Sequence, residues 1–258
     1  MSPFHALILG LLEGFTEFLP ISSTAHLVIG ARLLEIPSDG FLTSFVIAIQ
    51  LGAIASLLVL YRKTLITDFP LMLRVAVAFV PAAVVGFALY TIIKEIFLES
   101  LTIIAWALLA GGIIFIIFER ARKKGFMPEY EGTAATMSLQ KAVLIGCAQS
   151  FAVVPGVSRA GATILGGLAL GLPRVEIARF SFLLAIPTML AATGYDLLKT
   201  GSSFVLADWH ILLIGFVAAF AAAYVSARAL ISFVSTHSFE GFGWYRIVVA
   251  ILLFVFLV

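Results

Sequence analysis

Long apolar runs alternate with short polar stretches along most of the chain. A helix needs roughly 20 apolar residues to cross a hydrocarbon layer of about 30 Å. Six runs reach or approach this length, and they predict membrane-spanning helices at residues 41–61, 73–93, 101–118, 180–198, 209–231 and 244–258. The expected fold class is therefore an all-α, polytopic membrane protein.

Two further apolar runs are too short to cross. Residues 4–19 and 139–154 number 16 each, which as helix cover roughly 24 Å. Each run is followed by a proline, Pro20 or Pro155, then by small and hydroxyl residues and a second short apolar run. Irregular backbone at membrane depth must be buried in protein or line a wet cavity. The pattern therefore predicts two re-entrant helical hairpins, at residues 4–34 and 139–171.

The two hairpin regions resemble each other. Residues 6–13 align with residues 142–149 at a constant offset of 136, and the same offset places Ser22 on Ser158. Three predicted spans follow each hairpin, and an odd number of crossings turns the second unit upside down. The sequence thus predicts one membrane domain with an inverted-topology repeat, about residues 1–120 and 139–258, joined by a cytoplasmic linker at about 119–138.

Composition supports a membrane protein and excludes other classes. The 258 residues are 62% apolar and 12% charged, with a mean hydropathy of +1.15, whereas soluble domains are about half apolar and about a quarter charged. A single cysteine excludes a disulfide scaffold, and a formal charge of +2 with scattered basic residues argues against nucleic-acid binding. No basic residue precedes Arg32, so we expect the first apolar run to belong to the mature fold rather than to a secretory leader.

The basic residues predict the orientation in the membrane. Twelve fall on one side of the predicted spans: Arg62, Lys63, Arg74, Arg120, Arg122, Lys123, Lys124, Lys141, Arg174, Arg179, Arg228 and Arg246. Arg32, Lys94 and Lys199 fall near the other side. The positive-inside rule makes the first side cytoplasmic, so that both termini and the first hairpin are expected on the outer side. Arg159 belongs to no loop and is expected to be the lone interior guanidinium.

Glu13 and Glu17 lie four residues apart in the first short run, so they share one helix face. An ionisable side chain at membrane depth costs about 2.5–3.5 kcal/mol on insertion scales. The pair therefore needs a cation, a proton or an arginine, unless both carboxylates are solvated at the interface. A divalent-ion site for Mg²⁺ or Ca²⁺, completed by substrate phosphate oxygens, is the sharper interpretation.

Hydroxyl residues follow the first break. Ser22, Ser23 and Thr24 can cap the second half-helix of the hairpin. His26 comes three residues after Ser23, so the two can share a face. The histidine is then either a satisfied polar residue or the base for a serine nucleophile.

The second break reads PGVSRAGAT over residues 155–163. A glycine- and proline-rich turn leads into a helix N-terminus that carries Arg159. Backbone N–H groups, the helix dipole and a guanidinium fork all favour phosphate oxygens. An arginine paired with a buried glutamate for structural reasons would give the same sequence, and both interpretations can hold together.

The motifs EGFTEFLPISSTAH at residues 13–26 and PGVSRAGAT at 155–163 resemble the two signature motifs of bacterial undecaprenyl-diphosphatases, also called bacitracin resistance proteins. The resemblance runs over nearly the whole chain, including FVIAIQLGA at 45–53 and RFSFLLAIP at 179–187. In one departure, the usual second serine of the second motif is Ala160, which weakens any role for that hydroxyl.

The resemblance implies an integral hydrolase of the bacterial cytoplasmic membrane with a divalent cation and a site open to the periplasm. Undecaprenyl diphosphate would yield undecaprenyl phosphate and inorganic phosphate, which recycles the lipid carrier for peptidoglycan and confers bacitracin resistance. The expected catalytic residues are Glu13, Glu17, Ser23, His26 and Arg159, with Glu13 and Glu17 also as metal ligands, and the expected substrate-binding residues are Ser22, Thr24, Gln50, Ser158, Gly161 and Thr163. In the expected mechanism Ser23 attacks with His26 as base while Arg159 binds phosphate.

Several alternatives stay open at this point. A secondary transporter for a small anion, or a flippase for the lipid phosphate, shares the inverted repeat, broken helices and midplane charges. The Ser–His pair beside the carboxylates favours the hydrolase, although attack by His26 or by metal-bound water is also consistent with the sequence. The expected partners are the substrate lipid and the bilayer, and the sequence leaves open which metal is used and whether the chain forms a homodimer.

Overall fold

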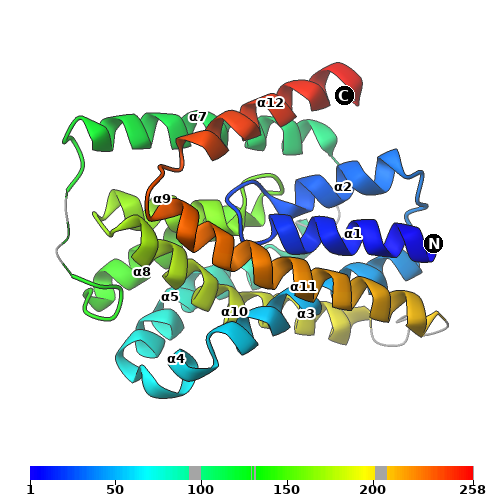
Figure 1. The fold of residues 1–258 in the computed structure, drawn as a ribbon, viewed down its shortest axis with the longest axis horizontal. Helices are drawn as coiled ribbons and strands as arrows, with labels where there is room; N and C mark the ends of the chain where they lie inside the picture. The colour runs from blue at the N-terminus through cyan, green and yellow to red at the C-terminus, as the bar shows by residue number, and fades with distance from the viewer. Residues whose placement is uncertain (93–99, 129, 131, 201–207, 258) are drawn as a thin grey trace.

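A computed structural model describes residues 1–92, 100–128, 130, 132–200 and 208–257. All regular elements in these residues are helices (Figure 1). In chain order they are α1 (Pro3–Thr16), α2 (Ser23–Leu33), α3 (Gly40–Leu60), α4 (Arg62–Thr67), α5 (Phe69–Ala88), α6 (Tyr90–Ile92), α7 (Leu101–Lys123), α8 (Leu139–Ser150), the 3₁₀ turn η2 (Phe151–Val153), α9 (Arg159–Ala169), α10 (Arg174–Thr200), α11 (Trp209–Val234) and α12 (Glu240–Phe256). The predicted all-helical fold class is confirmed for this part of the chain.

Five of the described helices, α3, α5, α7, α10 and α11, are long and apolar enough to cross a membrane. They coincide with five of the six predicted spans. α7 and α10 extend beyond the predicted ends, because their polar turns keep the helical hydrogen bonds after the apolar stretch is over. α12, at the sixth predicted span, has 17 residues, fewer than the roughly 20 that a span needs. The predicted ends at Ile93 and Val258 and the linker positions 129 and 131 lie outside the described residues.

The two predicted hairpins are present as pairs of short helices. α1 and α2 flank the first break, and α8 and α9 flank the second. The α1–α2 pair lies toward the end of the bundle that holds both termini, and the α8–α9 pair lies toward the opposite end (Figure 1). Neither limb of either pair is as long as a span, as expected for elements that stop inside the protein.

Each break ends on a serine with an unusual backbone. Ser22 has φ 72° and Ser158 has φ 71°, a region that non-glycine residues seldom adopt. Each serine is the N-cap of the helix that follows: the Ser22 hydroxyl accepts from the Ala25 N–H at 3.4 Å, and the Ser158 hydroxyl accepts from the Gly161 N–H at 3.1 Å. The predicted cap after Pro20 is therefore confirmed at Ser22.

Glycines let each hairpin pack closely on a long helix. α1 packs on α11, where a Cβ at Gly10 would lie 2.6 Å from the Gly215 carbonyl oxygen. α8 packs on α5, where a Cβ at Gly146 would lie 2.2 Å from the Ala78 carbonyl oxygen. Small residues commonly serve this purpose in membranes. The remaining main contacts join α3 to α10 and α11, α10 to α5 and α9, and α7 to α12.

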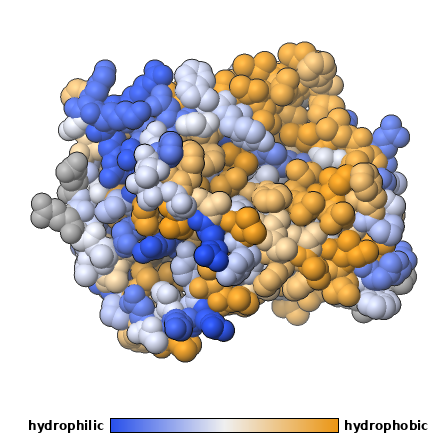
Figure 2. Space-filling view, in the orientation of Figure 1, coloured by the Kyte–Doolittle hydropathy of each residue, from blue (hydrophilic) through white to orange (hydrophobic). Residues whose placement is uncertain are grey.

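Polar and apolar surfaces separate along the bundle. Figure 2 shows hydrophilic residues gathered at the left end of the visible face and a wide hydrophobic area to the right. Arg120 and Lys123 near the end of α7 pair with Glu240 at the start of α12. The last turns of α7 lie at the left in Figure 1. Both chain termini lie at the opposite end. Lys94, one of the three basic residues predicted near that end, lies outside the described residues.

Arg246 corrects the predicted charge map. The sequence predicts that Arg246 flanks the last loop on the cytoplasmic side, but its side chain, in α12, is completely buried inside the protein. The expectation that Arg159 is the lone interior guanidinium is therefore wrong. An arginine near the end of a span usually extends toward the headgroups, but Arg246 instead donates to backbone carbonyl oxygens inside the protein.

Candidate active site

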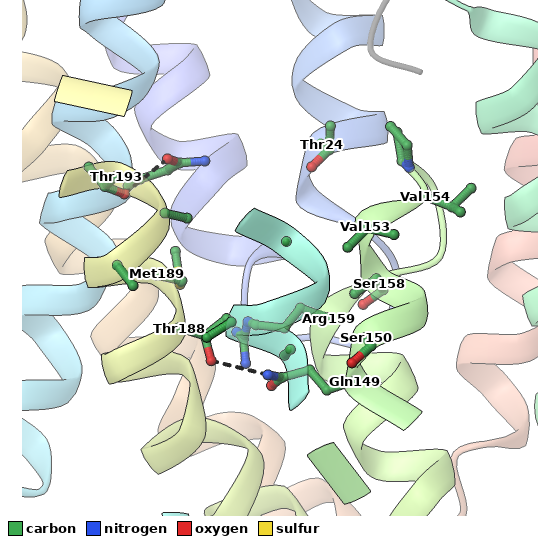
Figure 3. A pocket seen from close by; sticks show the side chains of 18 of the residues that line it. Thr24, Gln149, Ser150, Val153, Val154, Ser158, Arg159, Thr188, Met189 and Thr193 are labelled. Atoms are coloured by element: carbon green, nitrogen blue, oxygen red, sulfur yellow. Dashed lines mark hydrogen bonds between the residues drawn. The ribbon is translucent and has the colours of Figure 1, made fainter. Parts of the chain in front are cut away.

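A cavity of about 530 Å³ lies where the two breaks meet α5 and α10. Seven of the predicted site residues line it, namely Glu17, Ser22, Ser23, Thr24, Gln50, Ser158 and Arg159. Figure 3 shows Thr188 and Thr193 of α10 at the left, Ser158 and Gln149 at the right, Thr24 above them, and the Arg159 side chain between the two sides. The other predicted residues, Glu13, His26, Gly161 and Thr163, lie outside this lining.

Glu17 joins the chemistry of the two breaks. Its Oε2 accepts a hydrogen bond from the Ser23 hydroxyl, and its Oε1 accepts one from Arg159 Nη2 at 3.1 Å. The Arg159 and Glu17 side chains are only 10% and 9% exposed. Because the ion pair is shielded from water, screening of its charges is weak. A hydroxyl, a carboxylate and a guanidinium from segments 142 residues apart thus meet at one cavity wall.

Arg159 keeps one donor available. Its Nη1 donates to the Ser181 carbonyl oxygen at 3.0 Å, which fixes the plane of the guanidinium. Its Nε is buried and has no hydrogen-bond partner among the described residues. An unpaired donor in a buried guanidinium is costly, and a bound phosphate oxygen would remove that cost.

Glu13 has unpaired acceptors, whereas Arg159 has an unpaired donor. Its side chain is fully buried, and neither carboxylate oxygen has a hydrogen-bond partner in the described part of the chain. It lies one helical turn before Glu17, whose N–H donates to the Glu13 carbonyl oxygen at 2.9 Å. Two carboxylates on successive turns, one of them unpaired, form a donor set that fits a hard divalent cation. No group of three histidine, cysteine, aspartate or glutamate side chains suited to a metal occurs among the described residues, so other ligands would have to come from substrate or water.

Both ring nitrogens of His26 bond to partners other than Ser23. Its Nδ1 lies 2.7 Å from the Ser22 carbonyl oxygen and its Nε2 lies 2.8 Å from the Tyr245 hydroxyl. Facing a carbonyl requires a proton on Nδ1, so Nε2 accepts from Tyr245. The imidazole also stacks on the Tyr245 ring. The expected Ser23–His26 hydrogen bond is not among those of the described residues; Ser23 bonds to Glu17 instead.

Thr163 and Gly161 do not line the cavity but hydrogen-bond to Gln149 and Ser158, which do. The Thr163 hydroxyl lies 3.1 Å from Gln149 Oε1, and Gln149 Nε2 donates to the Thr188 hydroxyl at 3.1 Å (Figure 3). Gly161 donates its N–H to the capping hydroxyl of Ser158. Gln149 lines the cavity and is missing from the predicted site. The alignment of the two hairpins contained the signal, since Gln149 occupies the position that matches Glu13.

Apolar and aromatic side chains of α5 and α10 line the cavity beside Thr188 and Thr193. Phe79 and Phe87 from α5 face Met189 and Tyr195 from α10, and the Phe87 and Tyr195 rings meet edge to face at 5.5 Å. The sequence gives no sign of this wall, because an apolar residue in a membrane span looks the same whether it faces lipid or a cavity. Gln50 adds a polar position, where its Oε1 accepts from Thr193 at 3.4 Å.

Comparison with known proteins identifies the family. The family described as "Bacitracin resistance protein BacA" matches residues 6–252. The chain belongs to this family. Among relatives of the BacA family, the undecaprenyl-diphosphatase of Aquifex aeolicus (strain VF5) is 45% identical over 251 residues, which are 97% of each chain. That of Sulfurihydrogenibium sp. (strain YO3AOP1) is 46% identical over 253 residues, 98% of each chain. That of Wolinella succinogenes is 43% identical over 258 residues, 100% of this chain and 99% of the relative.

Membership of the BacA family confirms the resemblance carried by the two motifs. Both motifs fall inside the matched range, and the residues that follow each break line the same cavity. The family match agrees with a multi-pass membrane protein, as do the five candidate spans.

Proposed function

We propose that the chain is an undecaprenyl-diphosphatase, which releases inorganic phosphate from undecaprenyl diphosphate and leaves undecaprenyl phosphate. The observation that carries the proposal is the shared carboxylate of Glu17, bonded to the Ser23 hydroxyl and to the Arg159 guanidinium at the cavity wall. The full-length relatives that bear this name support it. The activity would recycle the lipid carrier of peptidoglycan synthesis and counter bacitracin.

Ser23 is the nucleophile in this proposal. Its oxygen attacks the terminal phosphorus, the bond from that phosphorus to the bridging oxygen breaks, and undecaprenyl phosphate leaves. The Ser23 proton passes to Glu17, which already accepts the hydroxyl hydrogen bond. Water then hydrolyses the phosphoserine, and inorganic phosphate departs. This assignment replaces His26 with Glu17 as the base, because His26 is already bonded on both ring nitrogens.

Arg159 neutralises the phosphate that is transferred. Its free Nε can bond a phosphate oxygen while Nη2 holds Glu17. Phosphoryl transfer depends chiefly on positioning and on charge stabilisation. Ser22, Ser158 and Thr24 line the same region and complete the polar contacts to the diphosphate.

Glu13 and Glu17 would hold the divalent cation. The unpaired oxygens of buried Glu13 support this assignment, and carboxylates with substrate oxygens are the usual donors for Mg²⁺. When bound, the cation would supply charge neutralisation for the diphosphate. Among the described residues, neither oxygen of the buried Glu13 carboxyl group has a hydrogen-bond partner.

The apolar wall suits the prenyl tail. Phe79, Phe87 and Met189 offer a dry surface next to the polar residues of the breaks. A lipid diphosphate has the same division between a compact charged head and a long apolar chain. The substrate would therefore lie with its head at the breaks and its tail between α5 and α10.

The inverted repeat is part of this proposal. In the proposed repeat α1 corresponds to α8, α3 to α10 and α5 to α11. The contacts follow this correspondence: α1 packs on α11 as α8 packs on α5, and α3 packs on α11 as α10 packs on α5. The same correspondence relates the close approach at Gly10 to the one at Gly146, 136 residues later. These correspondences, with the matched caps at Ser22 and Ser158, support two copies of one hairpin-plus-three unit.

Phosphate release from purified protein tests the function. Detergent-solubilised protein should release phosphate from undecaprenyl diphosphate, and the Glu17→Gln variant should not. If the parent protein releases none, while sealed vesicles containing it take up an anion or flip a lipid phosphate, the transporter or flippase alternative replaces the enzyme.

Thiol labelling in whole cells tests the proposed orientation, with the cavity open to the periplasm. Leu33 at the end of α2 and Phe126 beyond α7 are 69% and 77% exposed. In a Cys147→Ser background, a membrane-impermeant thiol reagent should label Leu33→Cys and spare Phe126→Cys until the cells are opened. The reverse pattern would invert the topology.

A further inference from the structure

Arg246 is completely buried in α12, yet among the described residues no carboxylate pairs with it. Its guanidinium donates only to backbone carbonyl oxygens: Pro20 at 3.1 Å and Val157 at 3.0 Å from Nη1, Gly156 at 2.8 Å and Ala107 at 3.1 Å from Nη2, and Leu108 at 3.4 Å from Nε. A buried charge is tolerated only when such hydrogen bonds compensate its lost hydration. The carbonyl dipoles provide that compensation here.

These carbonyls belong to three separate segments. Pro20 lies in the first break, Gly156 and Val157 lie in the second, and the remaining two oxygens come from α7. Nη1 alone bonds to both breaks at once. Since a break leaves carbonyls without helical partners, it offers acceptors that a regular helix lacks.

The neighbouring helix leaves room for this guanidinium. A Cβ at Gly111 of α7 would lie 2.2 Å from Arg246 Nη2 and 2.7 Å from Cζ. One residue later, a Cβ at Gly112 would lie 2.6 Å from the Gly243 carbonyl oxygen, so that α7 and α12 can approach closely. The glycine at 111 is therefore required by the position of the Arg246 side chain.

Arg246 does not line the cavity. Its contacts nevertheless end two or three residues before Ser23 in one break and before Arg159 in the other. The preceding residue of α12, Tyr245, bonds to His26 at 2.8 Å, so two consecutive side chains of this helix reach the hairpins.

We infer that Arg246 is a positioning residue, which clamps the two breaks together and so sets the Ser23–Glu17–Arg159 geometry. Its effect on turnover rests on the proposed function. Its effect on the backbone of the breaks does not, and this separation allows the two ideas to fail independently. Lysine cannot replace it, because one ammonium presents three donors at a single point, whereas the planar fork serves three segments.

Hydrogen exchange tests the clamp without any need for activity. The variants are Arg246→Lys and Gly111→Ala, which displaces the guanidinium but keeps it; the control is Gly241→Ala, where a Cβ meets nothing within 4 Å. In both test variants, amides at residues 17–24 and 153–161 should exchange about tenfold faster, while α3 and α11 stay unchanged. Unchanged breaks, or equal acceleration throughout the chain, would overturn the inference.

Turnover provides the second readout. Arg246→Lys should lower kcat for phosphate release about 30-fold in the parent and less than about threefold in an Arg159→Lys background, because both substitutions damage the same geometry. A purely structural role would reduce both backgrounds by the same factor through loss of folded protein, and that result would refute positioning. If the parent releases no phosphate, the proposed function fails and the exchange data still decide the clamp.

Discussion

The two breaks share one backbone but carry different chemistry. Each ends on a capping serine at positive φ, Ser22 at 72° and Ser158 at 71°, and each leads into a short helix of 11 residues. The first break, however, is preceded by two acidic residues, Glu13 and Glu17. At the matching position before the second break, Glu13 is replaced by the neutral Gln149.

The difference lies in what each break presents to the cavity. The residue after the cap is Ser23 in the first break and Arg159 in the second, and both bond to Glu17. A hydroxyl and a guanidinium thus occupy matching positions in the two breaks. The comparison teaches that a similar backbone conformation sets where the two side chains lie, while the residue types decide what they can do. In the proposed function the first break supplies the acid–base groups and the second break binds phosphate.

Removal of the shared carboxylate should have the largest effect. We expect Glu17→Gln to lower kcat about 1,000-fold, because the amide neither accepts the Ser23 proton nor balances Arg159. Phosphate release in detergent measures the loss. Glu240→Gln is the control, since that carboxylate pairs with Arg120 and Lys123 at the polar end of the bundle; a loss below tenfold at Glu17 would exclude it as the base.

A change confined to the second break should have the next largest effect. Arg159→Lys keeps the charge but loses the fork that bonds to Ser181 and Glu17 and that we propose binds phosphate, so kcat/KM should fall about 100-fold. The matched control is Arg120→Lys at the exposed end of α7. Near-parental kinetics for Arg159→Lys would mean that a point charge is sufficient and that the second break needs no planar donor.

Glu13 and Gln149 occupy matching positions in the two breaks, so each can be replaced by the residue type of the other. Glu13→Gln removes one of the two proposed cation ligands, so Mg²⁺ should raise the thermal midpoint of this variant less than it raises that of the parent protein. The Mg²⁺ concentration for half-maximal activity should increase about tenfold. In the other break, Gln149→Glu should lower the midpoint in EDTA. An equal rise with Mg²⁺ in the parent and in Glu13→Gln would exclude Glu13 as a cation ligand.

The sequence predicted the helices and breaks better than it predicted which residues contact one another across the fold. Apolar run lengths and prolines located both hairpins, because segments shorter than a span must stop inside the protein. The cost of burying charge placed Glu17 and Arg159 in the interior, and the structure pairs them. These predictions depend only on local composition and on the bilayer.

Contacts between distant segments were not predictable in the same way. Ser23 and His26 have the right spacing for a pair, yet each bonds to a residue of another turn or helix, Glu17 and Tyr245. The burial of Arg246 could not be predicted, because its carbonyl acceptors are backbone atoms, which leave no trace in residue identity. The partners of Ser23, His26 and Arg246 all depend on how the breaks are placed in the tertiary structure.

The smallest effects should come from the capping serines, where the two breaks are most alike. Ser22→Gly and Ser158→Gly tolerate the positive φ and lose only the cap, at a few tenths of a kcal/mol each. Ser22→Ala and Ser158→Ala lose the cap and add backbone strain, so each should cost about 2 kcal/mol. Chemical denaturation in detergent measures all four variants. Equal losses at the two positions would establish the shared turn, whereas a large alanine penalty at only one would show that the two breaks are held by different forces despite their matching dihedrals.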